Sequence, residues 1–188
     1  MRKLSMPELN RKSVSEFKGA AKNPIAIILD NVRSMHNVGS VFRTADAFLL
    51  DAIYLCGYTP RPPHRDIHKT ALGATETVHW QYFHTTSEAV ENLKNQGYHI
   101  AAVEQVEKSI PLHEFSRRED EKLAIVFGNE VTGIDSEVLK LCDYFIEIPQ
   151  WGMKHSLNIS VATGIVLWEM TKSGLNHLEQ KIERHNHS

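Results

Sequence analysis

Residues 145–170 read FIEIPQWGMKHSLNISVATGIVLWEM, and this stretch decides the fold that the rest of the chain completes. Its pattern predicts a buried strand ending at Ile148, a tight loop containing Gly152, and then a helix. We expect the helix to begin at Ser156, whose hydroxyl can cap free backbone N–H groups. Behind this start runs an apolar packing face at helical spacing, formed by Leu157, Val161, Ile165 and Trp168. Such a junction can present backbone donors to a ligand, and the polar Ser156 and Asn158 at its start indicate a binding site.

Length and composition set the broad class of the protein. The chain has 188 residues, enough for one domain with a substantial core. Lys and Arg number 21 against 23 Asp and Glu, which argues against a general nucleic-acid coat protein but permits a local basic patch. Cys56 and Cys142 lie in apolar, strand-like contexts and are predicted to be buried free thiols in a reducing compartment. The polar N-terminus, and the lack of an apolar run of ~20 residues, predict a cytoplasmic protein.

Strand-like apolar runs alternate with helical segments along the chain. Strands are expected at residues 25–29, 51–56, 98–103, 122–127 and 145–148, and another is expected after a helical turn within 70–82. Residues 104–122 are expected to form an exposed loop. The alternation predicts an α/β fold with a mostly parallel sheet flanked by helices. We divide the chain into a basic extension (1–23), the α/β domain (24–174) and a polar, loosely ordered tail that includes residues 175–188.

A glycine-bounded loop, GNEVTG at residues 128–133, follows one of the predicted central strands. Its glycines allow positive φ and a close approach of the backbone to a ligand. Glu130 falls at the carboxyl end of the strand, where open α/β sheets place their ligand sites. The loop lacks the Gly-Lys-Ser/Thr ending of phosphate-binding loops and the GxGxxG of dinucleotide sites. The chain also has no Ser–His–Asp set and no carboxylate pair at a telling spacing.

Basic side chains gather in the leader of residues 1–22 and in the loop TPRPPHRDIHK at 59–69. From charge alone, we predict phosphate contacts for Arg11, Lys12, Arg61, Arg65, Lys69 and Lys154. The alternative for both stretches is plain solvated surface. His64 and His68 have the i, i+4 spacing of a metal pair, but no further ligand lies nearby in the sequence, so no metal site is expected.

Three motifs occur in one order along the chain. The first is N-x-G-x-x-x-R-T-A, formed by Asn37, Gly39, Arg43, Thr44 and Ala45. The second is F-G-N-E-x-x-G, formed by Phe127, Gly128, Asn129, Glu130 and Gly133. The third is I-P-x-x-G-x-x-x-S-L-N, formed by Ile148, Pro149, Gly152, Ser156, Leu157 and Asn158. Together they resemble the SPOUT superfamily and, within it, the TrmH/SpoU-type RNA 2′-O-ribose methyltransferases.

The resemblance implies a deep trefoil knot in the C-terminal part of the domain, a homodimer, and S-adenosylmethionine as cofactor. It implies that the cofactor is held by Phe127, Gly128, Asn129, Ile148, Gly152, Ser156 and Leu157.

The resemblance also implies catalytic roles. It makes Arg43 the central catalytic residue, acting as a base activated by an RNA phosphate. A guanidinium is not ordinarily deprotonated in proteins, so an electrostatic role for Arg43 is equally sound. Asn37 would orient Arg43 or the ribose, and Glu130 would fix the geometry of the site. Ser156 and Asn158 would hold the loop and the nucleotide.

The substrate implied by the resemblance is RNA. Shorter family members commonly modify tRNA, which therefore is favoured over ribosomal RNA. Two alternatives remain besides ribosomal RNA. One is a knotted RNA-binding protein without turnover, and the other is an α/β enzyme acting on a small molecule.

Overall fold

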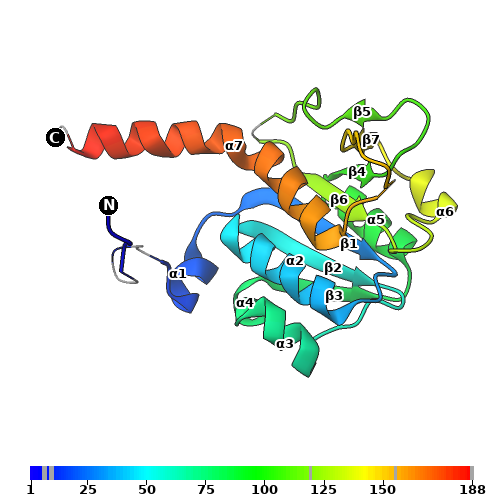
Figure 1. Cartoon of the computed structure of the whole chain (residues 1–188), viewed down its shortest axis with the longest axis horizontal. Helices are drawn as coiled ribbons and strands as arrows, with labels where there is room; N and C mark the ends of the chain where they lie inside the picture. The colour runs from blue at the N-terminus through cyan, green and yellow to red at the C-terminus, as the bar shows by residue number, and fades with distance from the viewer. Residues whose placement is uncertain (6–7, 9–10, 119, 155, 187–188) are drawn as a thin grey trace.

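The computed structural model describes residues 1–5, 8, 11–118, 120–154 and 156–186, with side chains up to Lys172 (Figure 1). Its strands are β1 (Asn23–Asp30), β2 (Leu50–Cys56), β3 (His79–Phe83), β4 (His99–Val103), β5 (Ile110–Pro111), β6 (Leu123–Phe127) and β7 (Tyr144–Glu147). Its helices are α1 (Val14–Gly19), α2 (Met35–Ala47), α3 (Arg65–Ala71), α4 (Ala74–Thr77), α5 (Thr86–Asn95), α6 (Ser136–Leu139) and α7 (Ile159–Asn186).

The strands form one sheet in the order β3-β2-β1-β6-β4-β7-β5. Every pairing between neighbouring strands is parallel, which confirms the predicted parallel α/β fold. The trefoil knot implied by the resemblance stays a prediction. The short edge strand β5 was not predicted, because two residues within a charged segment give no periodic signal.

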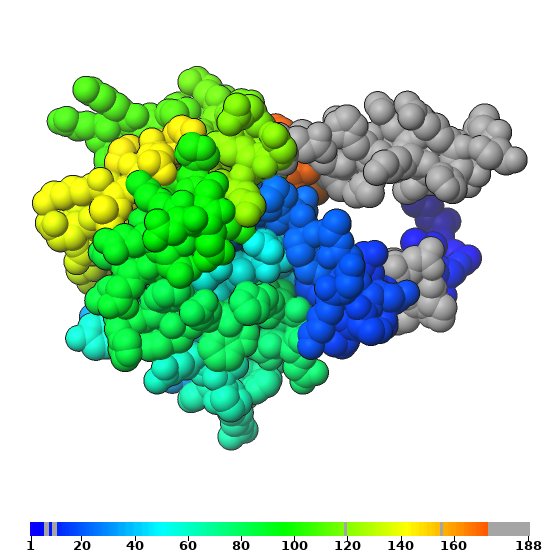
Figure 2. All heavy atoms as spheres, turned by 180° about the vertical axis from the view of Figure 1, so that it is seen from behind, coloured from blue at the N-terminus to red at the C-terminus, as the bar shows by residue number. Residues whose placement is uncertain are grey.

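Helices cover both faces of the sheet, because the central strands are apolar on both sides. Alternate residues of β1, Ile25, Ile27 and Leu29, pack on the side of α2 and α7. Ala26 and Ile28 pack on the side of α5 and α6. Figure 2 shows that second side, covered largely by the middle third of the chain, with the N-terminal segment at one edge. Because all the strand pairings are parallel, the carboxyl ends of the strands lie together at one edge of the sheet.

The loop predicted at 59–69 is partly helical. Helix α3 begins at Arg65, and His64 Nδ1 caps it by accepting a hydrogen bond from the Asp66 N–H at 3.2 Å. A histidine at an N-cap position was not foreseen, since Ser, Thr, Asp and Asn are the usual caps. The same interaction gives His64 a structural role.

Helix α7 differs from its prediction at both ends. It begins at Ile159 and not at Ser156, because Asn158 is the cap: its Oδ1 accepts from the Ser160 N–H at 2.9 Å, and its carbonyl accepts from Val161 and Ala162. It continues to Asn186, through residues predicted to be a loosely ordered tail. Residues 178–184, LEQKIER, are mostly strong helix formers, and extending an existing helix costs less than starting one.

The predicted apolar face of this helix does not pack on the sheet. Leu157, Val161, Ile165 and Trp168 are 38%, 51%, 39% and 56% exposed. The helix instead buries Ile159, Val166, Leu167 and Met170. It therefore has apolar side chains on two sides, one facing the core and one facing solvent.

The two cysteines are free, as predicted. Cys56 is buried and Cys142 is half-buried, and burial raises the pKa of each thiol to about 12. None of the helices in the described part of the chain is long and apolar enough to cross a membrane.

Candidate functional site

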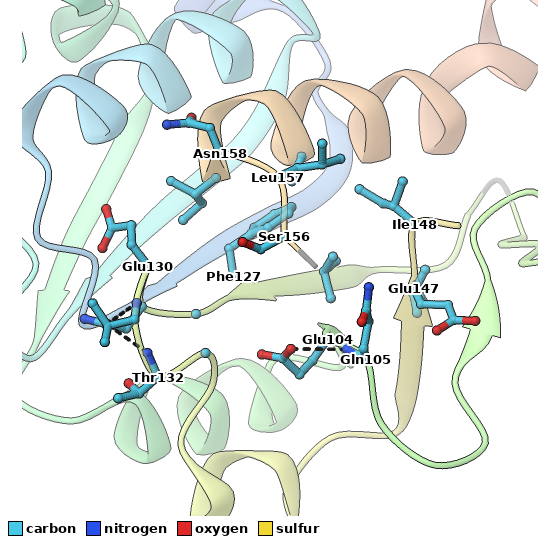
Figure 3. Close-up of a pocket in the computed structure, with 18 of the residues that line it drawn as sticks. Glu104, Gln105, Phe127, Glu130, Thr132, Glu147, Ile148, Ser156, Leu157 and Asn158 are labelled. Carbon is cyan, nitrogen blue, oxygen red and sulfur yellow. Dashed lines mark hydrogen bonds between the residues drawn. The ribbon is translucent and has the colours of Figure 1, made fainter. Parts of the chain in front are cut away.

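A cavity of about 540 Å³ lies at the carboxyl ends of β4, β6 and β7, beside the start of α7 (Figure 3). Eight residues of the predicted site line it: Phe127, Gly128, Asn129, Glu130, Ile148, Ser156, Leu157 and Asn158. Phe127, Ile148 and Leu157 give the cavity an apolar part. The described residues around it include three glutamates, Glu104, Glu130 and Glu147, and no Lys, Arg or His. The cavity thus combines apolar side chains with negative charge.

Glu130 ties the loop after β6 to the start of α2. One carboxylate oxygen accepts a hydrogen bond from the Arg33 N–H at 3.1 Å. The other accepts from the Ser34 N–H at 3.3 Å and from Asn37 Nδ2 at 3.1 Å. The negative charge of this carboxylate is also stabilised by the dipole of α2, because it lies at the N-terminal end of that helix.

Asn37 continues this network to the third motif. Its Oδ1 accepts a hydrogen bond from Asn158 Nδ2 at 3.2 Å. Glu130, Asn37 and Asn158 therefore form one chain of hydrogen bonds, although 93 and 121 residues separate the bonded pairs in sequence. The structure brings one residue from each of the three motifs together beside the cavity.

The charge of Glu130 is stabilised by these donors. Burial raises the pKa of this carboxyl, but the hydrogen bonds from the backbone N–H groups of Arg33, Glu130 itself and Ser34, and from Asn37, outweigh burial and leave the pKa below its ordinary value. Glu130 is therefore ionised at neutral pH and acts as a fixed acceptor.

The loop at 128–133 is closed by its own hydrogen bonds. Asn129 is 8% exposed; its Oδ1 accepts from the Val131 and Thr132 N–H groups, and its Nδ2 donates to the Asn31 carbonyl at 2.7 Å. Backbone bonds in both directions join Asn129 to Gly133. A Cβ on Gly128 would lie 2.3 Å from the backbone of Gly133. Gly128 therefore leaves room for the backbone of Gly133, and the predicted close approach of a ligand to Gly128 stays a prediction.

The motif residues Gly39, Gly152 and Arg43 are among those that do not line the cavity. Gly39 is needed where α2 packs on α3, since a Cβ there would be 2.3 Å from the Ile67 carbonyl oxygen. Gly152 is exposed, with open space around it. Arg43 is exposed on α2, about 9 Å along the helix axis from Asn37. It forms no hydrogen bond or ion pair with any residue that the structure describes.

The six predicted phosphate contacts, Arg11, Lys12, Arg61, Arg65, Lys69 and Lys154, are all exposed. Arg61 lies over the ring of Tyr82, with its Cζ 4.1 Å from the ring centroid. Lys69 pairs with Asp66 at 2.7 Å, so part of its charge is compensated within α3.

Glu104 is a residue of the cavity that the sequence did not reveal. The sequence predicts an exposed loop at residues 104–122, yet Glu104 lines the cavity directly after β4. The rule that placed Glu130 at a strand end applies equally to Glu104 and could have found it.

Comparison with known proteins gives this geometry a family. Residues 24–168 match the family described as SpoU rRNA Methylase. The chain belongs to this family. A relative from Aquifex aeolicus, named tRNA (guanosine(18)-2′-O)-methyltransferase, is 31% identical over 166 residues, which cover 86% of this chain and 75% of the relative.

Two solved structures share the fold of this chain. The crystal structure of an A. aeolicus TrmH/SpoU tRNA modifying enzyme has a TM-score of 0.73 at 28% identity, covering 83% of this chain and 78% of that one. An AdoMet-bound rRNA methyltransferase from Sinorhizobium meliloti has a TM-score of 0.75 at 25% identity, covering 81% and 57% of the two chains.

Proposed function

We propose that this protein transfers a methyl group from S-adenosylmethionine to a ribose 2′-hydroxyl of RNA, with tRNA as the favoured substrate. The observation that carries the proposal is the chain of hydrogen bonds from Glu130 through Asn37 to Asn158, which joins all three family motifs beside one cavity. Family membership supports the same reaction.

The cavity suits this cofactor in size and charge. Its volume of about 540 Å³ lies within the ~300–1,000 Å³ usual for small-molecule sites. The apolar Phe127, Ile148 and Leu157 offer surfaces for an adenine ring. Three glutamates with no lining cation among the described residues favour a ligand that carries positive charge, and disfavour a nucleotide with several phosphates.

The bound cofactor would supply an electrophilic methyl group on a sulfonium. The protein must then align the ribose oxygen with that methyl group, and alignment of this kind can contribute ~7–11 kcal/mol. Asn37 and Asn158 fix each other at the cavity, and Glu130 fixes Asn37. Ser156 and Asn158 hold the nucleotide, while Ile148 and Leu157 pack on the adenine.

Arg43 has an electrostatic role in this proposal. Its guanidinium is exposed and uncompensated by any described residue, so it is available to an RNA phosphate and to the negative charge that develops on the ribose oxygen.

The active form is a homodimer. Val161, Ile165 and Trp168 form an exposed apolar stripe on α7, and Trp151 and Met153 nearby in sequence are 94% and 83% exposed. Exposed apolar groups of this extent are typical of interaction sites. A second copy of the chain covers the stripe.

The relatives' names guide the choice of RNA. The A. aeolicus relative is named for guanosine 18 of tRNA, and the chain covers 75% of it. Guanosine 18 is therefore the first nucleotide to test, and ribosomal RNA is the second substrate class.

The test uses labelled S-adenosylmethionine with total tRNA and ribosomal RNA from a host that lacks this protein. We expect 2′-O-methyl nucleosides in tRNA with the wild type. Label should be lost with Arg43→Ala and retained with Arg118→Ala, a matched change of an exposed arginine outside the site. Absence of label in both RNA classes, despite measurable cofactor binding, would refute the proposed function.

A further inference from the structure

Glu104 occupies a defined place in the cavity. It follows β4 at the carboxyl edge of the sheet, and Figure 3 shows it on the side of the cavity opposite Leu157. A ligand whose base packs on Ile148 and Leu157 therefore extends toward a carboxylate on the other wall.

Hydrogen bonds and packing hold this carboxylate in one orientation. Oε2 accepts from the Ile134 N–H at 3.1 Å, and Oε1 accepts from the Gln105 N–H at 3.2 Å. A Cβ on Gly133 would lie 2.3 Å from Oε2, so the carboxylate rests against the glycine backbone. Substituting Gly133 would displace it.

The carboxylate retains unused acceptor capacity. An ionised carboxylate offers about four acceptor positions, and the described residues occupy two of them. Glu104 forms no salt bridge within the described residues, and the cavity has no cationic side chain among them. The free acceptor positions call for a ligand that donates hydrogen bonds and carries no negative charge at this point.

We propose that Glu104 accepts hydrogen bonds from the ribose hydroxyls of the cofactor, and this inference rests on the proposed function. Two neighbouring hydroxyls match the two oxygens of a carboxylate. An acidic side chain at a parallel strand end recognises the ribose of dinucleotides in other α/β folds for the same reason. Glu104 is thus a specificity-determining residue, which makes the site bind ligands with a ribose more tightly than the same ligands with a deoxyribose.

The experiment measures binding by calorimetry to the full chain and needs no RNA. The ligands are S-adenosylhomocysteine, its 2′-deoxy and 3′-deoxy analogues, and 5′-methylthioadenosine, which keeps the ribose and lacks the amino acid. The wild type should bind S-adenosylhomocysteine about 10-fold or more tightly than at least one deoxy analogue, as expected for a hydrogen bond to a charged group. Glu104→Gln should reduce this ratio several-fold and weaken 5′-methylthioadenosine as much as S-adenosylhomocysteine.

The matched control is Glu147→Gln, a second glutamate of the cavity whose side chain Figure 3 shows directed away from Glu104. It should leave the ribose-to-deoxyribose ratio unchanged.

Two results with Glu104→Gln would overturn the inference. An equal loss for ribose and deoxyribose ligands would mean that Glu104 only braces the turn at Gly133. A loss for S-adenosylhomocysteine alone, with 5′-methylthioadenosine unaffected, would place Glu104 at the amino group. If the wild type binds none of these ligands, the proposed function fails and this inference fails with it.

Discussion

The hydrogen bond between Asn37 and Glu130 can be tested by changing one atom. Asn37→Asp replaces the Nδ2 donor with an oxygen that faces the Glu130 carboxylate, where the present N···O distance is 3.1 Å. The original oxygen, Oδ1, is kept and still accepts a hydrogen bond from Asn158 Nδ2. The substitution thus converts an attractive contact into a contact between two negative charges, with little change in shape.

The expected loss of stability at neutral pH is a sum of three effects. Losing a hydrogen bond to a charged group costs ~1.5–3 kcal/mol. Repulsion between two charges about 4 Å apart costs ~1 kcal/mol in water and ~4 kcal/mol near a protein surface, and the exposure of Glu130 favours the lower figure. An acidic residue in the first turn of α2 recovers ~0.3–1 kcal/mol. The net destabilisation is ~2–4 kcal/mol, or a fall in Tm of ~5–15 °C.

The pH dependence separates repulsion from simple loss of a contact. In the wild type the pKa of Glu130 is lowered on folding, so its contribution to stability is present above ~4.3 and is lost as the pH falls. In Asn37→Asp, repulsion between the new carboxylate and that of Glu130 raises the pKa at which one of the two takes up a proton. The repulsion is therefore present at high pH and disappears when that carboxylate is protonated. The stability gap between variant and wild type should therefore narrow as the pH falls from 7.5 to 4.5.

The assay is thermal unfolding followed by circular dichroism at both pH values and at one fixed protein concentration, because dimerisation would shift Tm. Asn37→Ala is the control: it removes both hydrogen bonds and adds no charge, so its gap should change much less with pH. The reasoning would be refuted if the difference in Tm between Asn37→Asp and the wild type were the same at both pH values and equal to the difference for Asn37→Ala.

Three further predictions address packing, assembly and RNA binding. Gly39→Ala should lower Tm by ~2–10 °C, because the new Cβ would lie 2.3 Å from a backbone oxygen and overpacking costs ~1–3 kcal/mol. Gly164→Ala on α7 is the control and should not lower Tm, because the space around Gly164 is open. Ile165→Glu should turn the proposed dimer into a monomer in light scattering, and a dimeric mass unchanged by the substitution would contradict the proposed interface. Arg61→Ala should reduce the slope of log affinity for tRNA against log salt by ~1, while Arg61→Lys keeps it.

The fold was predictable because its determinants are local. Apolar runs such as those of β1 and β6 are long and bounded, and their alternation with helices leaves a parallel sheet as the simple solution. The rule for strand ends then placed Glu130 at the ligand edge. The hydrogen bond between Asn37 and Glu130 could not be predicted from the periodicity of the sequence. It joins residues 93 positions apart and depends on how α2 packs in the folded chain.

Helix α7 marks the limit of pattern reasoning. Its spacing revealed an apolar stripe, but both sets of apolar side chains fit a helical period. One set includes Val166 and Leu167, which are fully buried. The other includes Val161 and Ile165, which face solvent. Hydrophobicity alone does not tell a core from an interface, because both remove apolar area from water.

The exposed stripe and the position of Arg43 have one explanation in common. Helices α2 and α7 pack together, and the rings of Phe48 and Trp168 lie edge to face with their centroids 6.5 Å apart. Arg43 and the stripe therefore belong to neighbouring helices. Within one chain Arg43 does not line the cavity and has no described partner. A second copy seated on the stripe would bury apolar area and bring new groups to the α2 surface. Assembly and catalysis would then be coupled, and Ile165→Glu should lower methyl transfer together with dimerisation.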